Sequence, residues 1–246
     1  MVAAAKLLRH VGRRRSGQFL AEGPNLVETA LARGLVADVF VTEAAQLRFE
    51  ELLSGVSVHL VTERAAKSLS DTVTPVGLVA VCRMPDARWD DVLAADPKLV
   101  LVAVDTSEPG NAGTLIRIAD AMGADAVVLA GDGVDPFNGK CLRASAGSIF
   151  AVPVLSNSDG PGVVEALRGA GLRVLATTLD GELSLDDAEL TAPTAWLFGS
   201  EAHGLAPELA ALADDRVRIP MAGGAESLNI AAAAAICLYQ SARASR

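Results

Sequence analysis

The chain has 246 residues, of which 51% are hydrophobic and 21% are charged, and its formal net charge is −9. A chain of this length and apolar content buries a sizeable core, so the composition excludes a disordered, a collagen-like or a disulfide-rich protein. The apolar run at 230–239 is shorter than the about 20 residues that cross a bilayer, so we expect no membrane partner. No apolar stretch follows the N-terminal arginines, as a signal peptide requires, and we therefore expect a cytoplasmic protein.

Cysteine and histidine are too few and too scattered for a metal site. Cys82, Cys141 and Cys237 lie in separate apolar stretches, and no two have CxxC spacing. This pattern predicts buried free thiols, no disulfide framework and no bound metal. The sequence also contains no GxGxxG turn, Walker A loop, HExxH helix or GxSxG elbow. A nucleotide-dependent oxidoreductase is therefore disfavoured.

Charge is distributed unevenly along this acidic chain. The first 21 residues contain no Asp or Glu, and their cations are Lys6, Arg9, Arg13, Arg14 and Arg15. A basic segment on an acidic body has two interpretations. One is a solvated tail, and the other is an arm whose cations contact nucleic-acid phosphates and release counterions.

Short Val-rich runs predict strands in the first third of the chain, at 36–41, 56–61 and 76–82. Helical patterns are found between these runs, at 25–33 and 43–53. The segment at 83–97 combines two prolines with mixed charge and is the best candidate for a linker.

After this segment, the apolar run at 99–104 is typical of a parallel strand that is covered on both faces. Further strands are predicted at 126–130, 172–177, 195–198 and 217–219, and helices at 111–122, 162–169 and 228–242. The alternation of strands and helices favours an α/β fold with a mainly parallel sheet.

Three glycine-containing segments follow predicted strands in this second part, and each carries polar side chains. Asn111 stands where a helix begins, Glu201 follows the strand at 195–198, and Ser227 and Asn229 precede the last helix. Each residue has an ordinary alternative role at a helix N-terminus. Open α/β sheets bind ligands outside the carboxyl ends of their strands, so three such segments favour a cofactor pocket.

Arg117 is unusual because it lies between Ile116 and Ile118 in the first of these helices. An unpaired buried charge is costly, which makes an ion pair with Asp120 one interpretation of this arginine. The other is a functional guanidinium that reaches toward a bound ligand. The spacing alone leaves both open.

Three segments carry a resemblance to a known family, namely NAGTLIR at 111–117, LFGSEAHGL at 197–205 and IPMAGGAESLNIAAAAAI at 219–236. In this order they resemble the three motifs of the SpoU, or TrmH-like, RNA ribose 2′-O-methyltransferases of the SPOUT class. The segment at 140–150 resembles a further family segment. Ser200 and Ala231 depart from the family, in which Asn and Ser are common at these positions.

The resemblance implies an enzyme that transfers a methyl group from S-adenosyl-L-methionine to a ribose 2′-hydroxyl of structured RNA, with ribosomal RNA favoured over transfer RNA. It implies a small α/β ribosomal-protein-like RNA-binding domain at 1–90, with a basic arm at 1–21, and a methyltransferase domain at 91–246. It also implies a deep C-terminal trefoil knot in the second domain and a homodimer whose active site uses both subunits. A transfer-RNA methyltransferase and a non-catalytic RNA-binding protein on the same scaffold are the alternatives.

The resemblance further implies which residues form the site. The expected catalytic residues are Asn111, Arg117, Glu201, Ser227 and Asn229. The expected cofactor contacts are Thr177, Thr178, Leu179, Phe198, Gly199, Ser200, Glu201, Gly204, Ile219, Met221, Ser227 and Leu228. The expected RNA contacts are Arg9, Arg13, Arg14, Arg15 and Arg143.

The expected role of Arg117 follows from the chemistry of its side chain. An arginine stays protonated near neutral pH and is therefore a poor base. We expect Arg117 to bind the adjacent phosphate and to stabilise the developing alkoxide electrostatically. The family proposal, in which this arginine acts as a base with help from that phosphate, remains the alternative.

Overall fold

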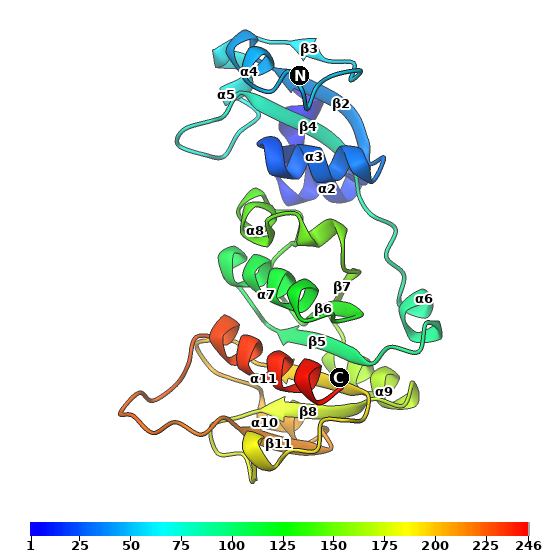
Figure 1. Ribbon diagram of the computed structural model, residues 1–246, viewed down its shortest axis with the longest axis vertical. Helices are drawn as coiled ribbons and strands as arrows, with labels where there is room; N and C mark the ends of the chain where they lie inside the picture. Colours follow the sequence, from blue (N-terminus) through cyan, green and yellow to red (C-terminus); the bar gives the residue numbers. More distant parts are fainter. Residues whose placement is uncertain (246) are drawn as a thin grey trace.

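The computed structural model describes residues 1–245, which form two α/β units joined by an irregular segment at 84–88 (Figure 1). The N-terminal unit, residues 1–83, is built on a four-stranded sheet. The parallel-sheet unit, residues 89–245, is built on a seven-stranded sheet. The expected α/β class is confirmed.

The sheet of the N-terminal unit has the strand order β1-β4-β2-β3. Its strands are β1 (Gln18–Glu22), β2 (Val36–Val41), β3 (His59–Leu60) and β4 (Leu78–Arg83), and its connecting helices are α3 (Pro24–Ala32), α4 (Glu43–Arg48) and α5 (Glu63–Lys67). β4 is antiparallel to β1 and β2, whereas β3 is parallel to β2. The hydroxyls of Thr42 and Thr62 cap α4 and α5, each accepting a backbone N–H at 3.3 Å.

The basic N-terminal segment is folded and is not a free arm. It forms α1 (Val2–Ala5), η1 (Lys6–Leu8) and α2 (His10–Ser16) before it enters β1. Ala4 and Leu7 are buried in a cluster with Leu20 of β1. Gly12 lets α2 lie close to η1, because a Cβ at this position would stand 2.0 Å from the carbonyl oxygen of Lys6. Burial of these apolar residues therefore makes the segment an integral part of the N-terminal unit.

The seven-stranded sheet has the order β7-β6-β5-β10-β8-β11-β9, and each neighbouring pair is parallel. Its strands are β5 (Leu99–Val104), β6 (Ala126–Ala130), β7 (Val154–Asn157), β8 (Arg173–Thr177), β9 (Leu183–Ser184), β10 (Thr194–Phe198) and β11 (Asp215–Arg218). β5, β6 and β10 are buried along their whole length, as expected of apolar strands in the middle of a covered sheet. The expected mainly parallel sheet is confirmed.

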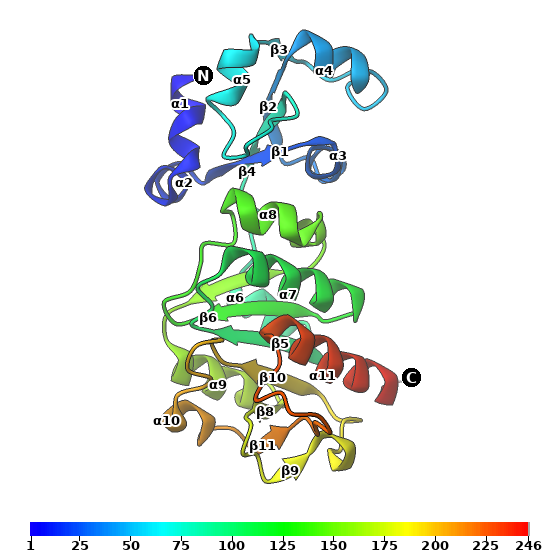
Figure 2. The same ribbon diagram turned by 90° about the vertical axis from the view of Figure 1, so that its left-hand side faces the viewer.

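Helices cover both faces of this sheet (Figure 2). One face carries α7 (Pro109–Ala121), α8 (Gly139–Ser145) and α11 (Ile230–Ala244), and the other carries α6 (Trp89–Ala94), α9 (Gly160–Gly169) and α10 (Pro207–Ala210). Gly113 permits close packing of α7 on α8, because a Cβ there would lie 2.3 Å from the carbonyl oxygen of Cys141. A buried hydrogen bond from Trp196 Nε1 to Ser241 Oγ, 2.9 Å long, ties α11 to β10. Within residues 1–245, the helices lack the combined length and apolar character needed to cross a bilayer.

One strand of the sheet, β11, lies between two strands, β8 and β9, that are connected earlier in the chain. The segment at 178–182 joins β8 to β9, and β11 pairs with both of these strands. Arg218 Nη1 donates to the carbonyl oxygens of Gly181 and Glu182, both at 2.8 Å. The loop is therefore hydrogen-bonded to the strand that it spans, and the chain continues from β11 through 219–229 into α11.

The strands predicted at 36–41, 99–104 and 126–130 have the predicted bounds. Two predictions were too long, because the strand at 56–61 is reduced to β3 and the linker at 83–97 contains α6. The sequence patterns missed β1, α8, β7 and β9, together with the short helices η2 (Ser148–Phe150) and η3 (Leu185–Asp187). Short elements such as these depend on tertiary packing more than on their own periodicity.

All three cysteines are free and buried, as predicted. Burial raises the pKa of each thiol to about 12. Since the thiolate is the reactive form, we expect no reaction of the folded protein with a thiol-specific chromogenic reagent at mildly alkaline pH. Unfolding in guanidinium should release all three thiols. Rapid labelling of the native protein would contradict this packing.

Candidate active site

Three polar side chains from distant parts of the chain meet at the carboxyl-terminal edge of the parallel sheet. Glu201 follows β10, Asn111 lies in the first turn of α7, and Asn229 precedes α11. The Oε1 atom of Glu201 accepts hydrogen bonds from Asn111 Nδ2 and from Asn229 Nδ2, the latter at 3.1 Å. Asn229 Nδ2 also lies 3.5 Å from Asn111 Oδ1. Two amides thus orient one exposed carboxylate.

Local capping fixes the two asparagines. Asn229 is the N-cap of α11, and its Oδ1 accepts the N–H of Ala231 at 2.9 Å, which leaves its Nδ2 directed at Glu201. The N-cap of α7 is Glu108, so Asn111 is free of the capping role that its sequence suggested. Hydrogen bonds from Lys140 and from the Gly110 N–H lower the pKa of the Glu108 carboxyl, which therefore caps the helix as a carboxylate.

A cleft of about 620 Å³ begins at Glu201 and extends along the ends of β8, β10 and β11. Every residue expected to contact the cofactor lines this one cleft. Its walls also contain residues that the sequence did not single out, among them Asp180, His203, Arg216 and Glu226. Of the three clustered residues, Glu201 lines the cleft, so the cluster borders it.

Backbone geometry shapes the cleft at Gly199. Ser200 and Gly204 form an isolated antiparallel bridge, in which Gly204 N–H donates to the carbonyl oxygen of Ser200 at 2.8 Å. A Cβ at Gly199 would lie 2.1 Å from the carbonyl carbon of Gly204, so the tight loop accepts no side chain there. This close approach is the physical reason for a glycine at the end of β10.

The opposite wall belongs to the loop at 178–182. Arg216 donates to Glu182, which lowers the pKa of that carboxyl, and lies 3.4 Å from Asp180. Thr177 Oγ1 donates to the carbonyl oxygen of Leu197 at 2.8 Å. The hydroxyl oxygen of Thr178 is buried and has no hydrogen-bond partner within residues 1–245. An unpaired buried hydroxyl of this kind is rare, since buried hydroxyls are almost always hydrogen-bonded.

Comparison with known families identifies this arrangement. The sequence model of the family described as SpoU rRNA Methylase matches residues 98–239, which is more than half of the chain. The chain belongs to the SpoU rRNA methylase family. A second model, described as the MRM3-like substrate binding domain, matches residues 3–80 of this SpoU methylase.

Relatives match across both units. A 23S rRNA (guanosine(2553)-2′-O)-methyltransferase, RlmP of Bacillus subtilis, is 36% identical, with 92% of this chain and 89% of that protein covered. A 23S rRNA (uridine(2479)-2′-O)-methyltransferase of Streptomyces viridochromogenes is 32% identical, with 94% and 84% covered. The solved structure of the SpoU methyltransferase AviRb from the same organism, in complex with AdoMet, aligns with a TM-score of 0.87 at 32% identity, covering 98% of this chain and 95% of that one.

Arg117 is not among the residues that hydrogen-bond to Glu201 in this SpoU methylase. Its side chain is exposed on α7 and does not line the cleft. Within residues 1–245 it makes no hydrogen bond or ion pair, so the pair with Asp120 that the sequence suggested is not formed. Ser227 lines the cleft but leaves the capping of α11 to Asn229.

The predicted RNA contacts divide into two groups. Arg9, Arg14 and Arg15 are exposed on the N-terminal unit. Arg13 is buried, with 4% of its surface exposed, and its guanidinium pairs with Asp135. Arg143 pairs with Asp71. Both arginines are thus already paired with carboxylates of the protein, and their contact with RNA stays a prediction.

In the part of the chain that the structure describes, no three His, Cys, Asp or Glu side chains are arranged to hold a metal ion.

Proposed function

We propose that the chain transfers a methyl group from S-adenosyl-L-methionine to a ribose 2′-hydroxyl in ribosomal RNA. The observation that carries this proposal is the cleft that ends at Glu201, where two asparagines orient the carboxylate. Membership of the SpoU family supports the reaction, and the names of relatives that match both units support ribosomal RNA over transfer RNA.

The cleft fits the cofactor in size and chemistry. Its volume of about 620 Å³ lies in the range of small-molecule sites. Leu179, Met221 and Leu228 are large apolar side chains that remain partly exposed in its walls, and they offer an apolar surface to an adenine ring. The sulfonium of S-adenosyl-L-methionine supplies an already activated methyl group, so the protein must orient and deprotonate the acceptor hydroxyl.

Glu201 is placed to receive the ribose. Asn111 and Asn229 occupy its Oε1 atom, and within residues 1–245 its Oε2 atom accepts no hydrogen bond. We propose that Oε2 accepts the 2′-hydroxyl or holds Arg117, while Ser227 fixes the acceptor or the methionine end of the cofactor. Positioning of this kind is worth about 7–11 kcal/mol in well-oriented reactions.

We propose that the site is completed by a second copy of the chain. Arg117 lies on α7, outside the cleft of its own subunit, and α11 beside it exposes Ile236 and Tyr239. A homodimer that buries this face would bring the Arg117 side chain of one subunit to the Glu201 cluster of the other. There the guanidinium would bind the phosphate next to the target ribose and stabilise the alkoxide. A base role for Arg117 is the alternative.

We also propose that the C-terminal chain forms the trefoil knot of the SPOUT class. The position of β11 between β8 and β9, which the segment at 178–182 joins, supports this topology. The division into an RNA-binding domain at 1–90 and a methyltransferase domain at 91–246 is supported by the two separate sheets. A cytoplasmic location stays a prediction.

One assay tests the function. The protein is incubated with S-adenosyl-L-methionine that carries a labelled methyl group and with an unmodified transcript of bacterial 23S rRNA. Ribose methylation is then mapped by its resistance to alkaline cleavage. We expect a single labelled ribose. Label in a base, label in transfer RNA only, or cofactor binding without transfer to any RNA would each contradict the proposal.

The exposed arginines of the N-terminal segment supply a second test. Replacing Arg9, Arg14 and Arg15 together by Ala should weaken RNA binding and lower the salt-dependence slope by up to about three. The cofactor affinity should not change. Lys98→Ala is the control, because it removes an exposed cation of the parallel-sheet unit, directly before β5. An unchanged slope in filter binding across a salt series would show that these cations do not contact phosphates.

A further inference from the structure

The two units meet at a charged junction that lies outside the active site. Arg13 of α2 reaches from the N-terminal unit to Asp135 of the parallel-sheet unit, where its Nε and Nη2 atoms lie 2.7 and 2.6 Å from Oδ2. Arg13 Nη1 also donates to the carbonyl oxygen of Leu7 at 2.8 Å. The side chains of Arg13 and Asp135 are only 5% and 14% exposed, so water screens this pair weakly.

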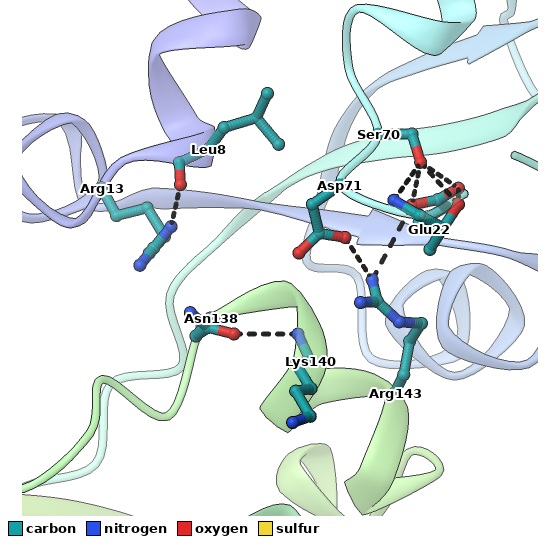
Figure 3. Close-up of polar contacts among 9 residues, drawn as sticks. Leu8, Arg13, Glu22, Ser70, Asp71, Asn138, Lys140 and Arg143 are labelled. Carbon is teal, nitrogen blue, oxygen red and sulfur yellow. Dashed lines mark hydrogen bonds and ion pairs between the residues drawn. The ribbon is translucent and has the colours of Figure 1, made fainter. Parts of the chain in front are cut away.

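A second pair crosses the junction in the opposite direction. Arg143 of α8 points to the N-terminal unit, where its Nη1 atom lies 2.5 Å from Asp71 Oδ1 and 3.9 Å from Glu22 Oε2 (Figure 3). Glu22 is itself held by Ser70, whose hydroxyl donates to its carboxylate at 2.7 Å. Lys140, on the same short helix, points away from this junction (Figure 3). The acidic partners of Arg143 are thus fixed within the N-terminal unit.

The two pairs and an aromatic contact together restrict how the units can move. The N-terminal unit supplies Arg13 and Asp71, and the parallel-sheet unit supplies their partners Asp135 and Arg143. Sliding or rotation of one unit against the other would therefore break both pairs. Between them, Phe19 of the N-terminal unit packs on Phe137 and Phe150, with ring centroids 4.9 and 5.9 Å apart. Units joined by a short irregular segment otherwise move relative to one another.

We propose that these reciprocal ion pairs form a clasp that fixes the orientation of the RNA-binding unit relative to the parallel-sheet unit and thereby determines which ribose reaches Glu201. The proposal rests on the proposed function, because it concerns the placement of the substrate RNA. Arg13 and Arg143 are then positioning residues, which act through the orientation of the exposed arginines of the N-terminal unit. A misplacement of about 1 Å can lower turnover by two orders of magnitude.

The clasp differs from direct RNA binding in one measurable respect. If Arg143 contacted RNA, Asp71→Ala would free its charge and leave RNA binding intact or improved. If Arg143 belongs to the clasp, Asp71→Ala should impair RNA binding in the same direction as Arg143→Ala, and no more strongly, because Arg143 keeps its contact with Glu22 at 3.9 Å.

The experiment compares these variants on the unmodified 23S rRNA transcript. Arg143→Ala should raise the KM for the transcript about fivefold, and Asp71→Ala should raise it by at most the same factor, since partly exposed pairs contribute little individually. Asp71→Ala combined with Asp135→Asn breaks both pairs and should raise it at least about tenfold. Asn at 135 keeps the hydrogen bond that Oδ1 accepts from the Phe137 N–H at 2.9 Å. The cofactor affinity, measured by calorimetry, should stay unchanged in all variants.

Arg168→Ala is the matched control. Arg168 pairs with Asp214 at 2.6 Å and is 46% exposed, but both residues belong to the parallel-sheet unit. Its loss should leave the KM unchanged. Small-angle scattering adds a readout that needs no RNA, and the variant without both pairs should show a larger radius of gyration than the wild type.

The possible outcomes separate the clasp from the proposed function. A wild-type protein that methylates no RNA refutes the function, and the scattering curves still test the clasp. A normal KM and normal scattering in the variant without both pairs overturn the clasp. A raised KM in Arg143→Ala together with a normal KM in Asp71→Ala also overturns the clasp, and would indicate that Arg143 binds RNA directly.

Discussion

Arg117→Lys is expected to bind S-adenosyl-L-methionine normally and to lose at least about two orders of magnitude in methyl transfer. The guanidinium can hold two oxygens through a planar fork, and an ammonium cannot reproduce that geometry. Arg117 is exposed and makes no ion pair within residues 1–245, so the substitution should leave the stability of the fold unchanged. Single-turnover methylation of the transcript, beside a calorimetric cofactor titration, measures both quantities.

Arg168→Lys is the control for this substitution, because Arg168 is an exposed arginine of α9 on the opposite face of the sheet. It should retain normal turnover. Near-normal turnover in Arg117→Lys would remove Arg117 from the mechanism and leave Glu201 as the next candidate.

Mixing two inactive variants tests whether Arg117 acts in the partner's site. In a mixed dimer of Arg117→Lys and Glu201→Gln subunits, one site would contain both wild-type residues if the site is shared between subunits. Random pairing would then restore about a quarter of the wild-type activity. Sites built within one chain would restore none, because every such site would carry one substitution.

Gly199→Ala is expected to weaken cofactor binding about 10- to 100-fold. The added Cβ would lie 2.1 Å from the carbonyl carbon of Gly204 and 2.2 Å from the Leu205 nitrogen. Both are backbone atoms, so the loop that forms the cleft wall must open to admit the methyl group. Because β10 ends before this position, the sheet itself should remain intact.

Gly224→Ala is the control, since a Cβ at that glycine meets no atom within 4 Å. Gly224 lies in the segment that leads to α11 and does not line the cleft. Calorimetric titration with S-adenosyl-L-methionine should show wild-type affinity for this variant. Unchanged affinity in Gly199→Ala would place the cofactor away from the loop at 199–205.

The sequence by itself determined the centre of the parallel sheet, and its family motifs indicated many of the residues that line the cleft. β5 and β6 are continuous apolar runs, which leave few alternatives to a strand covered on both faces. The predicted cofactor contacts lie in contiguous motifs that follow strand ends. Because parallel strands bring their carboxyl ends to one edge, contiguous motifs of this kind meet in a single cleft.

Only the tertiary structure decided which arginines are free. Arg13, Arg14 and Arg15 are adjacent and chemically identical, yet Arg13 is buried beside Asp135, 122 positions away in the sequence. Arg143 likewise finds Asp71 at a separation of 72. The tertiary structure also shows that Arg117 lies outside the cleft of its own chain. A sequence records how many charges a segment carries, but the partner of each charge depends on packing between units, which no local pattern encodes.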